Sequence, residues 1–493
     1  MHNRYVNRKI EEIFSDQHKL NLWQETELVV LAAKAQLKQI KPDTCEQIKQ
    51  LLLSHPIDFE IWQGLDKLTK HDLNAFLMER RKHLPTNLQP EFHKSMTSYD
   101  TEEPAWAIML KEAYNYIVAM ISDIKIELIT KAKTYRYLPM IGRTHGQEAQ
   151  LQSFGKRYLT WLQEISMAEE ALLKAAENLS LSKLSGAIGN YGGLDPEVEQ
   201  AALKLLGLEP YYGATQIMPR ALYTPLANAL STLVCSLNKI ALDIRLGARS
   251  GRPIFQEPFA KNQKGSSAMP HKKNTIMTEQ MEGMQRMALG YLQMIMQNIS
   301  TWEERAIEQS CVERVAWPDL FHVACRALDV MTKVLSGMEI YPVNMMWEII
   351  NSRGCYASNE AKEFLAEIGL NFNLTVEDAY RIIQLAAFNS FDIVQDSFVE
   401  NFPPKSWQQC EKIQAVLTAS PPCPPVSIEQ IISEHKLIAS EKLSASTEQV
   451  ECWNEMLEQI FAIEQNKKRW SEIFSLPYLL RHEETLYLQI LGE

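Results

Sequence analysis

The segment at residues 257–274, EPFAKNQKGSSAMPHKKN, is the part of the chain best equipped for chemistry. Gly265 and the two serines that follow it, Ser266 and Ser267, permit a mobile backbone. The segment also concentrates basic residues, namely Lys261, Lys264, His271, Lys272 and Lys273. This positive charge would attract an anionic substrate, although the segment taken alone is also explained as a solvated basic loop.

Three histidines at interruptions of the apolar pattern are candidates for proton transfer. His145 lies between two glycines in IGRTHGQ at 141–147, His71 lies in TKHD at 69–72, and His93 begins HKSMTSYD at 93–100. Because the ordinary histidine pKa is near 6.5, an exposed loop histidine beside a cleft can donate or accept a proton at neutral pH. Each of them singly is also explained as a hydrogen-bonded structural histidine.

The elements that must position these residues are predicted to be helices. Apolar residues recur at spacings of three and four within 104–130, 226–244 and 277–295, which places them along one face of a helix. Such stripes on long segments are typical of helices that pack at a shallow angle in a bundle. The methionines of the third stripe are interpreted as adaptable core filler. Strand patterns are few and short, so we predict an all-α fold.

Proline-containing interruptions suggest where the domains divide. A chain of 493 residues has the length of about three domains. Three prolines within residues 85–104 suggest the end of an N-terminal helical region. Residues 251–274 form a long predicted loop, and 401–426 contain six prolines that indicate a connection or excursion. We therefore predict three mostly helical domains, at 1–103, 104–350 and 351–493, with the central one a bundle of long helices.

Charge and cysteine usage narrow the class of protein. The net charge of -11 argues against binding to nucleic acid or to an anionic membrane. No apolar run approaches the roughly 20 residues of a membrane span, and the first residues lack the apolar segment of a signal peptide, so a cytoplasmic protein is expected. The 8 cysteines include no CxxC pair and no zinc-ligand cluster with histidine. We expect reduced thiols, most of them buried.

The segment GSSAMPHKKN closely resembles the signature of the fumarase/aspartase superfamily, and EPFAKNQKGSSAMPHKKN resembles its adenylosuccinate lyase branch. The resemblance runs in order from residue 4 to about residue 390. The other matching blocks are Arg4-Tyr5, TKHD, HKSMTSYD, GRTHGQ, SGAIGNYGG at 185–193, Thr215-Gln216 and WEERAIEQSCVER at 302–314.

The resemblance implies a carbon–nitrogen lyase of purine nucleotide synthesis. Such enzymes eliminate fumarate from adenylosuccinate to give AMP, and from the succinyl-carboxamide ribotide SAICAR to give AICAR. By this resemblance Ser266 is the base and His145 the general acid, with His71 as its helper. A serine alkoxide needs preorganised donors and positive charge, for which neighbouring backbone N–H groups and Lys272 are candidates.

Other positions match the family's substrate-binding residues. Glu279 matches a glutamate that orients the catalytic groups, and its alternative is an ordinary carboxylate on a helix surface. Lys272 and Asn274 would hold the succinyl carboxylates. Arg305, Ser310 and Arg314 would bind phosphate. The remaining matched positions are Arg4, Tyr5, Lys70, Asp72, His93, Thr97, Ser98 and Gln216.

The family also implies the protein's assembly. Its members are homotetramers whose active sites combine residues from three chains, and their mechanism requires neither a metal nor an organic cofactor. The expected partners are therefore the nucleotide substrate and three further copies of the chain.

Several family positions are changed in this chain. Tyr99 replaces a small hydroxyl residue, while Glu303, Ala306 and Gln309 replace a histidine, an aspartate and a histidine. These changes leave the relative use of adenylosuccinate and SAICAR open. Two alternatives also stay open: a superfamily lyase or cycloisomerase that acts on another dicarboxylate, and a catalytically silent helical oligomer.

Overall fold

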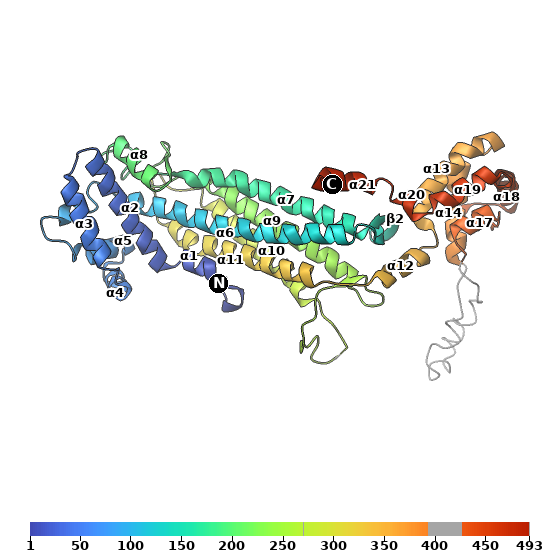
Figure 1. The fold of residues 1–493 in the computed structure, drawn as a ribbon, viewed down its shortest axis with the longest axis horizontal. Coiled ribbons are helices and arrows are strands. Elements are labelled where there is room, and N and C mark those ends of the chain that lie inside the picture. Colours follow the sequence, from blue (N-terminus) through green and yellow to red (C-terminus); the bar gives the residue numbers. More distant parts are fainter. Residues whose placement is uncertain (270, 393–425, 493) are drawn as a thin grey trace. The chain divides into compact units, whose positions relative to one another are not determined.

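The computed structural model describes residues 1–269, 271–392 and 426–492, and these are mostly helical (Figure 1). The described chain divides into two compact units. Unit 1 comprises residues 1–127, 161–249 and 256–339, and unit 2 comprises residues 128–160, 250–255 and 340–493. The predicted domain boundaries at 103 and 350 stay a prediction.

Among the described residues up to 337, the α-helices are α1 (Arg8–Ile13), α2 (Asp16–Gln36), α3 (Pro42–Ser54), α4 (Phe59–Thr69), α5 (Asp72–Arg81), α6 (Ser98–Thr134), α7 (Phe154–Ala176), α8 (Pro196–Leu205), α9 (Thr224–Gly247), α10 (Ile276–Gln297) and α11 (Glu308–Gly337). Of these, α2, α6, α7, α9, α10 and α11 are the long helices. Short 3-10 helices are η1 (Asn3–Tyr5), η2 (Gln89–Glu91), η3 (Glu177–Ser180) and η4 (Arg220–Leu222).

The long helices α9, α10 and α11 pack on one another in unit 1. The apolar stripes at 226–244 and 277–295 predict the first two of them. Leu230 and Leu237 of α9 and Ala288 of α10 are fully buried, and so is Met281 of the methionine stripe. Helix α7 joins this bundle through the Trp161 indole, which donates to Asp243 of α9 over 2.9 Å. The bundle is therefore confirmed, and so is the core-filling role of Met281 and Met284.

Pro104 corrects one expectation, because it lies inside helix α6 rather than in an interruption between helices. A proline in a helix loses one backbone hydrogen bond. Burial of the same helix offsets that loss, since Ala107, Leu110 and Ile117 are fully buried along it.

Unit 2 contains the one sizeable pair of strands among the described residues. Strands β1 (Pro139–Thr144) and β2 (Gln147–Ser153) form an antiparallel hairpin, with Thr144 opposite Gln147. The prediction of few strands is confirmed, but this hairpin was not foreseen. The other strands have two residues each: β3 (Leu181–Ser182), β4 (Glu209–Pro210), β5 (Phe255–Gln256) and β6 (Glu339–Ile340).

The C-terminal helices of unit 2 surround their own apolar core. Phe364, Trp453, Phe461 and Trp470 are among its buried aromatic residues. The helices are α12 (Pro342–Asn351), α13 (Ser358–Gly369), α14 (Val376–Asp392), α17 (Ile428–Ser433), α18 (Thr447–Ala462), α19 (Glu464–Ile473), α20 (Leu476–Leu479) and α21 (Glu483–Leu491), with 3-10 helices η5 (Cys355–Ala357), η6 (Leu370–Phe372) and η7 (Glu441–Leu443).

The expectation that most cysteines are buried is wrong for the described residues. Cys325 is buried, whereas Cys311 and Cys452 are exposed, and Cys45, Cys235 and Cys355 are partly exposed; all six are free thiols. Cys311 and Cys452 fall on outward faces of amphipathic helices, where the helix period overrides the residue's preference for burial.

The proline-rich segment 401–426 lies, except for Val426, outside the described residues. None of the described helices combines the length and apolar character that a membrane span requires.

Candidate active site

Six of the predicted site residues line a single cavity of ≈ 680 Å³ in unit 1. They come from two places, the turn between α4 and α5 and the stretch that leads into and begins α11. These residues are Lys70, His71, Asp72, Arg305, Ser310 and Arg314. The structure therefore brings together predicted residues that are more than 200 positions apart in the sequence.

The turn between α4 and α5 fixes the backbone of three of these residues. Lys70 ends α4 in the left-handed region, at φ 54°, and donates its backbone N–H to Asp66. His71 is the N-cap of α5, and its Nδ1 accepts the backbone N–H of Asn74 over 3.4 Å. A neutral His71 that accepts at Nδ1 carries its proton on Nε2, the nitrogen that is left for another partner.

The beginning of α11 supplies the groups best suited to phosphate. Ser310 lies in its first turn, and Arg314 lies one turn later, so both side chains reach the same cavity. Arg314 Nη2 donates to Asp72 Oδ2 over 2.7 Å. This ion pair joins α5 to α11 and holds one guanidinium at the wall of the cavity.

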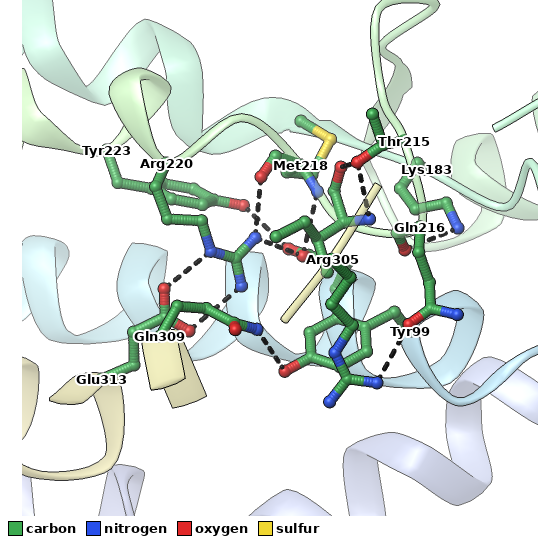
Figure 2. Close-up of polar contacts among 12 residues, drawn as sticks. Tyr99, Lys183, Thr215, Gln216, Met218, Arg220, Tyr223, Arg305, Gln309 and Glu313 are labelled. Atoms are coloured by element: carbon green, nitrogen blue, oxygen red, sulfur yellow. Dashed lines mark hydrogen bonds and ion pairs between the residues drawn. The ribbon is translucent and has the colours of Figure 1, made fainter. Parts of the chain in front are cut away.

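Arg305 and Gln216 meet although they are 89 residues apart. Arg305 Nη1 donates to Gln216 Oε1 over 3.0 Å, as Figure 2 shows. The preceding residues are tied as well, because Thr215 Oγ1 donates to the carbonyl oxygen of Glu304 over 2.7 Å. The two segments are therefore fixed against each other beside the cavity.

A fully buried ion pair fixes the backbone around Gln216 and around the start of α6. Lys183 Nζ lies 2.7 Å from Asp100 Oδ1 and donates to the carbonyl oxygen of Gln216 over 3.0 Å. Asp100 also accepts the backbone N–H of Thr97 over 2.8 Å, at the residue before Ser98 begins α6. Sequence reasoning missed Lys183 and Asp100 as positioning residues, although both lie in or beside the matched blocks.

His93 is held by a buried carboxylate. Its Nδ1 lies 2.7 Å from Glu27 Oε1, to which Thr101 Oγ1 also donates over 2.6 Å. The backbone of His93 adopts a positive φ of 64°, which for a residue other than glycine is uncommon. The buried hydrogen bond to Glu27 fits the explanation of His93 as a held histidine, and it leaves Nε2 for another partner.

The signature loop also has a defined local structure. Ser266 Oγ accepts the backbone N–H groups of Ala268 over 3.3 Å and of Met269 over 3.1 Å. Asn274 Nδ2 donates to the carbonyl oxygen of Gly265 over 2.7 Å, which closes the loop on itself. Two N–H donors on one hydroxyl oxygen stabilise negative charge there, which is the environment that a serine base requires.

Glu257, which sequence reasoning did not single out, anchors the end of this loop. Its buried carboxylate accepts the backbone N–H groups of Met277 over 3.0 Å and of Thr278 over 2.9 Å, in the first turn of α10. Glu279 follows in the same turn and is exposed, as is Lys272 in the loop. The sequence feature that could have indicated Glu257 is its place at the start of the extended signature, EPFAKNQKGSSAMPHKKN.

The cavity does not include all the predicted residues. Among the described residues, its lining lacks the loop positions Ser266, Lys272, Asn274 and Glu279. It also lacks Arg4, Tyr5, His93, Thr97, Ser98 and Gln216. Arg4 is exposed within η1, whose N-cap His2 accepts the Arg4 backbone N–H through Nδ1.

His145 belongs to unit 2, whereas the other predicted site residues belong to unit 1. It stands at the tip of the β1–β2 hairpin and is exposed. His145 and Gly146 both adopt positive φ, at 53° and 76°, a combination typical of a two-residue type I′ turn. The tight turn presents the imidazole at the exposed tip of the hairpin.

Glu102 is a further cavity residue that sequence reasoning missed. It lines the cavity and an adjoining pocket together with Asp72. Burial, reinforced by the negative charge of Asp72, raises the pKa of Glu102 to about 8. The carboxyl is therefore mostly protonated at pH 7, which weakens its repulsion of an anion there. The sequence feature that could have indicated Glu102 is its position four residues after Ser98, on the same face of α6.

No group of three or more potential ligand side chains in the described part of the chain is arranged to hold a metal ion. The cavity instead offers two guanidiniums and a serine hydroxyl, the donor types that suit a phosphate group.

Comparison with known proteins identifies the family. The family model described as Lyase matches residues 8–290. Adenylosuccinate lyase from Synechocystis sp. is 32% identical over 400 residues, which are 81% of this chain and 91% of that protein. Adenylosuccinate lyase from Thermotoga maritima is 33% identical over 392 residues, covering 80% and 89%. The Bacillus subtilis protein of the same name is 31% identical over 399 residues, covering 80% and 89%.

Solved structures share the fold at lower sequence identity. A fumarate lyase from Mesorhizobium has a TM-score of 0.76 at 18% identity, covering 100% of this chain and 99% of that chain. A beta-carboxy-cis,cis-muconate cycloisomerase from Acinetobacter calcoaceticus has a TM-score of 0.74 at 18% identity, covering 99% and 98%. The predicted all-α superfamily fold is confirmed. Together with the sequence relatives, these matches show that the chain belongs to the adenylosuccinate lyase family of the fumarase/aspartase superfamily.

Proposed function

We propose that the chain is an enzyme that eliminates fumarate from adenylosuccinate to give AMP, and from SAICAR to give AICAR. A base removes a proton from the succinyl carbon next to the one bonded to nitrogen. The electron pair of that C–H bond forms the C=C bond of fumarate, and the C–N bond breaks as an acid protonates the departing nitrogen. Both proton transfers need positioned groups at neutral pH.

The observation that carries this proposal is the gathering of Arg305, Ser310 and Arg314 around one cavity. Two guanidiniums and a hydroxyl match the charge and geometry of a nucleotide phosphate. A dicarboxylate without a phosphate would not require this set. Lys70 and Asp72 line the same cavity and would contact the nucleotide.

The signature loop supports Ser266 as the base. Its hydroxyl oxygen already receives two backbone N–H groups, which would stabilise the alkoxide form. Lys272 and Asn274 would hold the succinyl carboxylates, and His145 would protonate the leaving nitrogen with help from His71. Glu279, exposed in the first turn of α10, would orient the catalytic groups.

The remaining binding positions would complete the nucleotide site. Arg4, Tyr5, His93, Thr97, Ser98 and Gln216 match the family's substrate contacts. By the family resemblance, the working form would be a cytoplasmic homotetramer with shared active sites. His145 and Ser266 of one site would then not need to come from one chain. The reaction as written requires no metal or organic cofactor.

The test is an assay of the purified protein with adenylosuccinate and with SAICAR, following absorbance and fumarate release. The wild type should convert both substrates, and Ser266→Ala should lose at least about 10³-fold in kcat. Ser267→Ala is the matched control in the same loop and should retain activity within about tenfold. Turnover of only a phosphate-free dicarboxylate, or of no candidate at all, would contradict the proposal.

Shared active sites have a separate test. His145→Ala and Ser266→Ala are each expected to be inactive, and mixing and reassembling them should restore part of the activity. Absence of recovery, with subunit exchange demonstrated by labelled chains, would contradict active sites that combine residues from different chains.

A further inference from the structure

Tyr99 and Gln309 form a buried hydrogen-bonded pair 210 residues apart in the sequence. Gln309 Nε2 donates to the Tyr99 hydroxyl oxygen over 3.1 Å, and the exposed fractions of the two residues are 1% and 4%. Each is the second residue of a long helix, Tyr99 of α6 and Gln309 of α11. The pair therefore joins the beginnings of two helices that carry predicted substrate-binding residues.

The ring of Tyr99 lies against the guanidinium of Arg305. The Arg305 Cζ atom is 4.2 Å from the ring centroid, well within the range of a cation–π contact. Figure 2 shows Tyr99 between Gln309, which contacts its hydroxyl, and Arg305, which crosses its ring. A ring that is buried and bonded at its hydroxyl cannot turn away, so it offers a fixed surface to the guanidinium.

The guanidinium of Arg305 has N–H groups without a protein partner among the described residues, whereas that of its neighbour Arg220 is engaged by two carboxylates. Among the described residues, Arg305 donates one hydrogen bond, to Gln216, and its guanidinium has five N–H groups. Arg220 also lies near the Tyr99 ring, 5.8 Å from its centroid, but its Nε donates to Glu313 over 2.7 Å and its Nη1 to Glu103. Of the two guanidiniums, Arg305 is the one available to a ligand.

The Tyr99 and Gln309 side chains contact each other directly, so a change in one alters the support of the other. This contact indicates that they act as one unit.

We propose that Tyr99 and Gln309 are a positioning pair that holds Arg305 for the phosphate of the nucleotide. The inference rests on the proposed function, in which Arg305 binds phosphate. The pair acts through Arg305 and does not itself contact the reacting atoms. An arginine held in advance loses less side-chain freedom when the ligand arrives, so it binds that ligand more tightly.

The experiment measures the AMP affinity of the full-length protein by calorimetry, together with KM and kcat. Tyr99→Leu should weaken AMP binding about tenfold and raise KM similarly, with kcat within about threefold. Tyr99→Phe and Gln309→Leu should each weaken binding about threefold, and the double variant should be no worse than either alone. Tyr191→Phe is the matched control, because the Tyr191 hydroxyl donates to Glu199 over 2.6 Å outside the cavity lining. It should leave AMP binding unchanged.

An Arg305→Gln background separates positioning from general stability. If Tyr99 acts through Arg305, Tyr99→Leu should have no further effect on AMP affinity once Arg305→Gln is present. An equal loss in both backgrounds, or additive losses for Tyr99→Phe and Gln309→Leu, would overturn the inference. Should Tyr99→Leu fail to fold, the Tyr99→Phe and Gln309→Leu pair decides the matter alone. If Arg305→Gln itself leaves AMP affinity unchanged, the phosphate site of the proposed function is wrong instead.

Discussion

The cavity of unit 1 and the signature loop are held in place in different ways. The cavity depends on side-chain contacts between distant segments, such as the bond from Arg314 to Asp72 across 242 residues. The loop depends on bonds between near neighbours, such as those from the Ala268 and Met269 backbone to Ser266. The cavity is therefore fixed by the packing of helices, whereas the loop can move without breaking the core, as a segment that closes over a substrate must.

After removal of the proposed base itself, the largest effect is expected from a change that alters the loop and leaves the cavity intact. A Cβ atom at Gly265 would lie 1.9 Å from the carbonyl oxygen of Lys272, so Gly265→Ala cannot keep the observed loop conformation. A displaced base costs catalysis rather than nucleotide binding. We expect kcat to fall about 100-fold while AMP affinity, measured by calorimetry, stays within about twofold.

The control for this variant is Gly283→Ala, in helix α10. No atom lies within 4 Å of the Cβ that it adds, and alanine favours a helix more than glycine does. It should therefore retain full activity. An equal loss of AMP affinity and of kcat in Gly265→Ala would show that loop and cavity are not independent.

A change in the cavity should have the opposite effect, raising KM and leaving kcat nearly unchanged. Arg314→Gln removes one of the proposed charged donors to phosphate and leaves Asp72 without its ion pair. Bonds to charged groups contribute about 1.5–3 kcal/mol, so we expect KM to rise about 30-fold with kcat within about threefold. Steady-state kinetics at several substrate concentrations separates the two constants.

Arg326→Gln is the matched control on the same helix, because Arg326 pairs with Asp329 over 3.2 Å and lies outside the cavity lining. Its KM should be unchanged. A fall in kcat without a rise in KM for Arg314→Gln would contradict the assignment of Arg314 to ground-state binding of the nucleotide.

The same contrast explains what could be predicted from the sequence. The signature loop is contiguous, so its residue types revealed a candidate site, and the apolar stripes predicted α9 and α10 because a helix repeats its faces every three to four residues. The contact between Tyr99 and Gln309 could not be found, because one sequence does not say which distant residues meet. The hairpin that carries His145 was missed since its strands lack regular alternation of apolar and polar residues.

A smaller, pH-dependent effect is expected in the cavity. The pKa of Glu102, raised to about 8 by burial and then by Asp72, makes its carboxyl neutral below that pH and negative above it. The added negative charge would oppose phosphate binding beside Arg305 and Arg314. We therefore expect KM to rise severalfold between pH 7 and pH 9, and Glu102→Gln to remove this rise. A pH profile of KM that is identical in the two proteins would contradict this role.

The same titration affects stability. Below the ordinary carboxyl pKa of 4.5, Glu102 is protonated in both the folded and the unfolded chain. As pH rises from there to about 8, the unfolded chain releases its proton first, so folding stability falls across this range. Glu102→Gln should flatten that part of the stability profile, which denaturant titrations at pH 5 and pH 8 would detect.

The smallest effect concerns the anchor of the loop. Like the cavity, this anchor depends on a buried side chain that joins residues distant in the sequence. The buried carboxylate of Glu257 holds the Met277 and Thr278 N–H groups at the start of α10. Glu257→Gln turns one acceptor into a donor that faces an N–H group, at a cost of about 1–2 kcal/mol. Hydrogen exchange at Met277 and Thr278 should become about tenfold faster, with kcat within about threefold. Glu282→Gln, at a half-buried position on the same helix whose carboxylate pairs with Arg245 and Arg286, should leave both amides unchanged. A loss of kcat as large as that of Gly265→Ala would mean that the loop depends on this buried anchor, and that the difference between loop and cavity is one of degree.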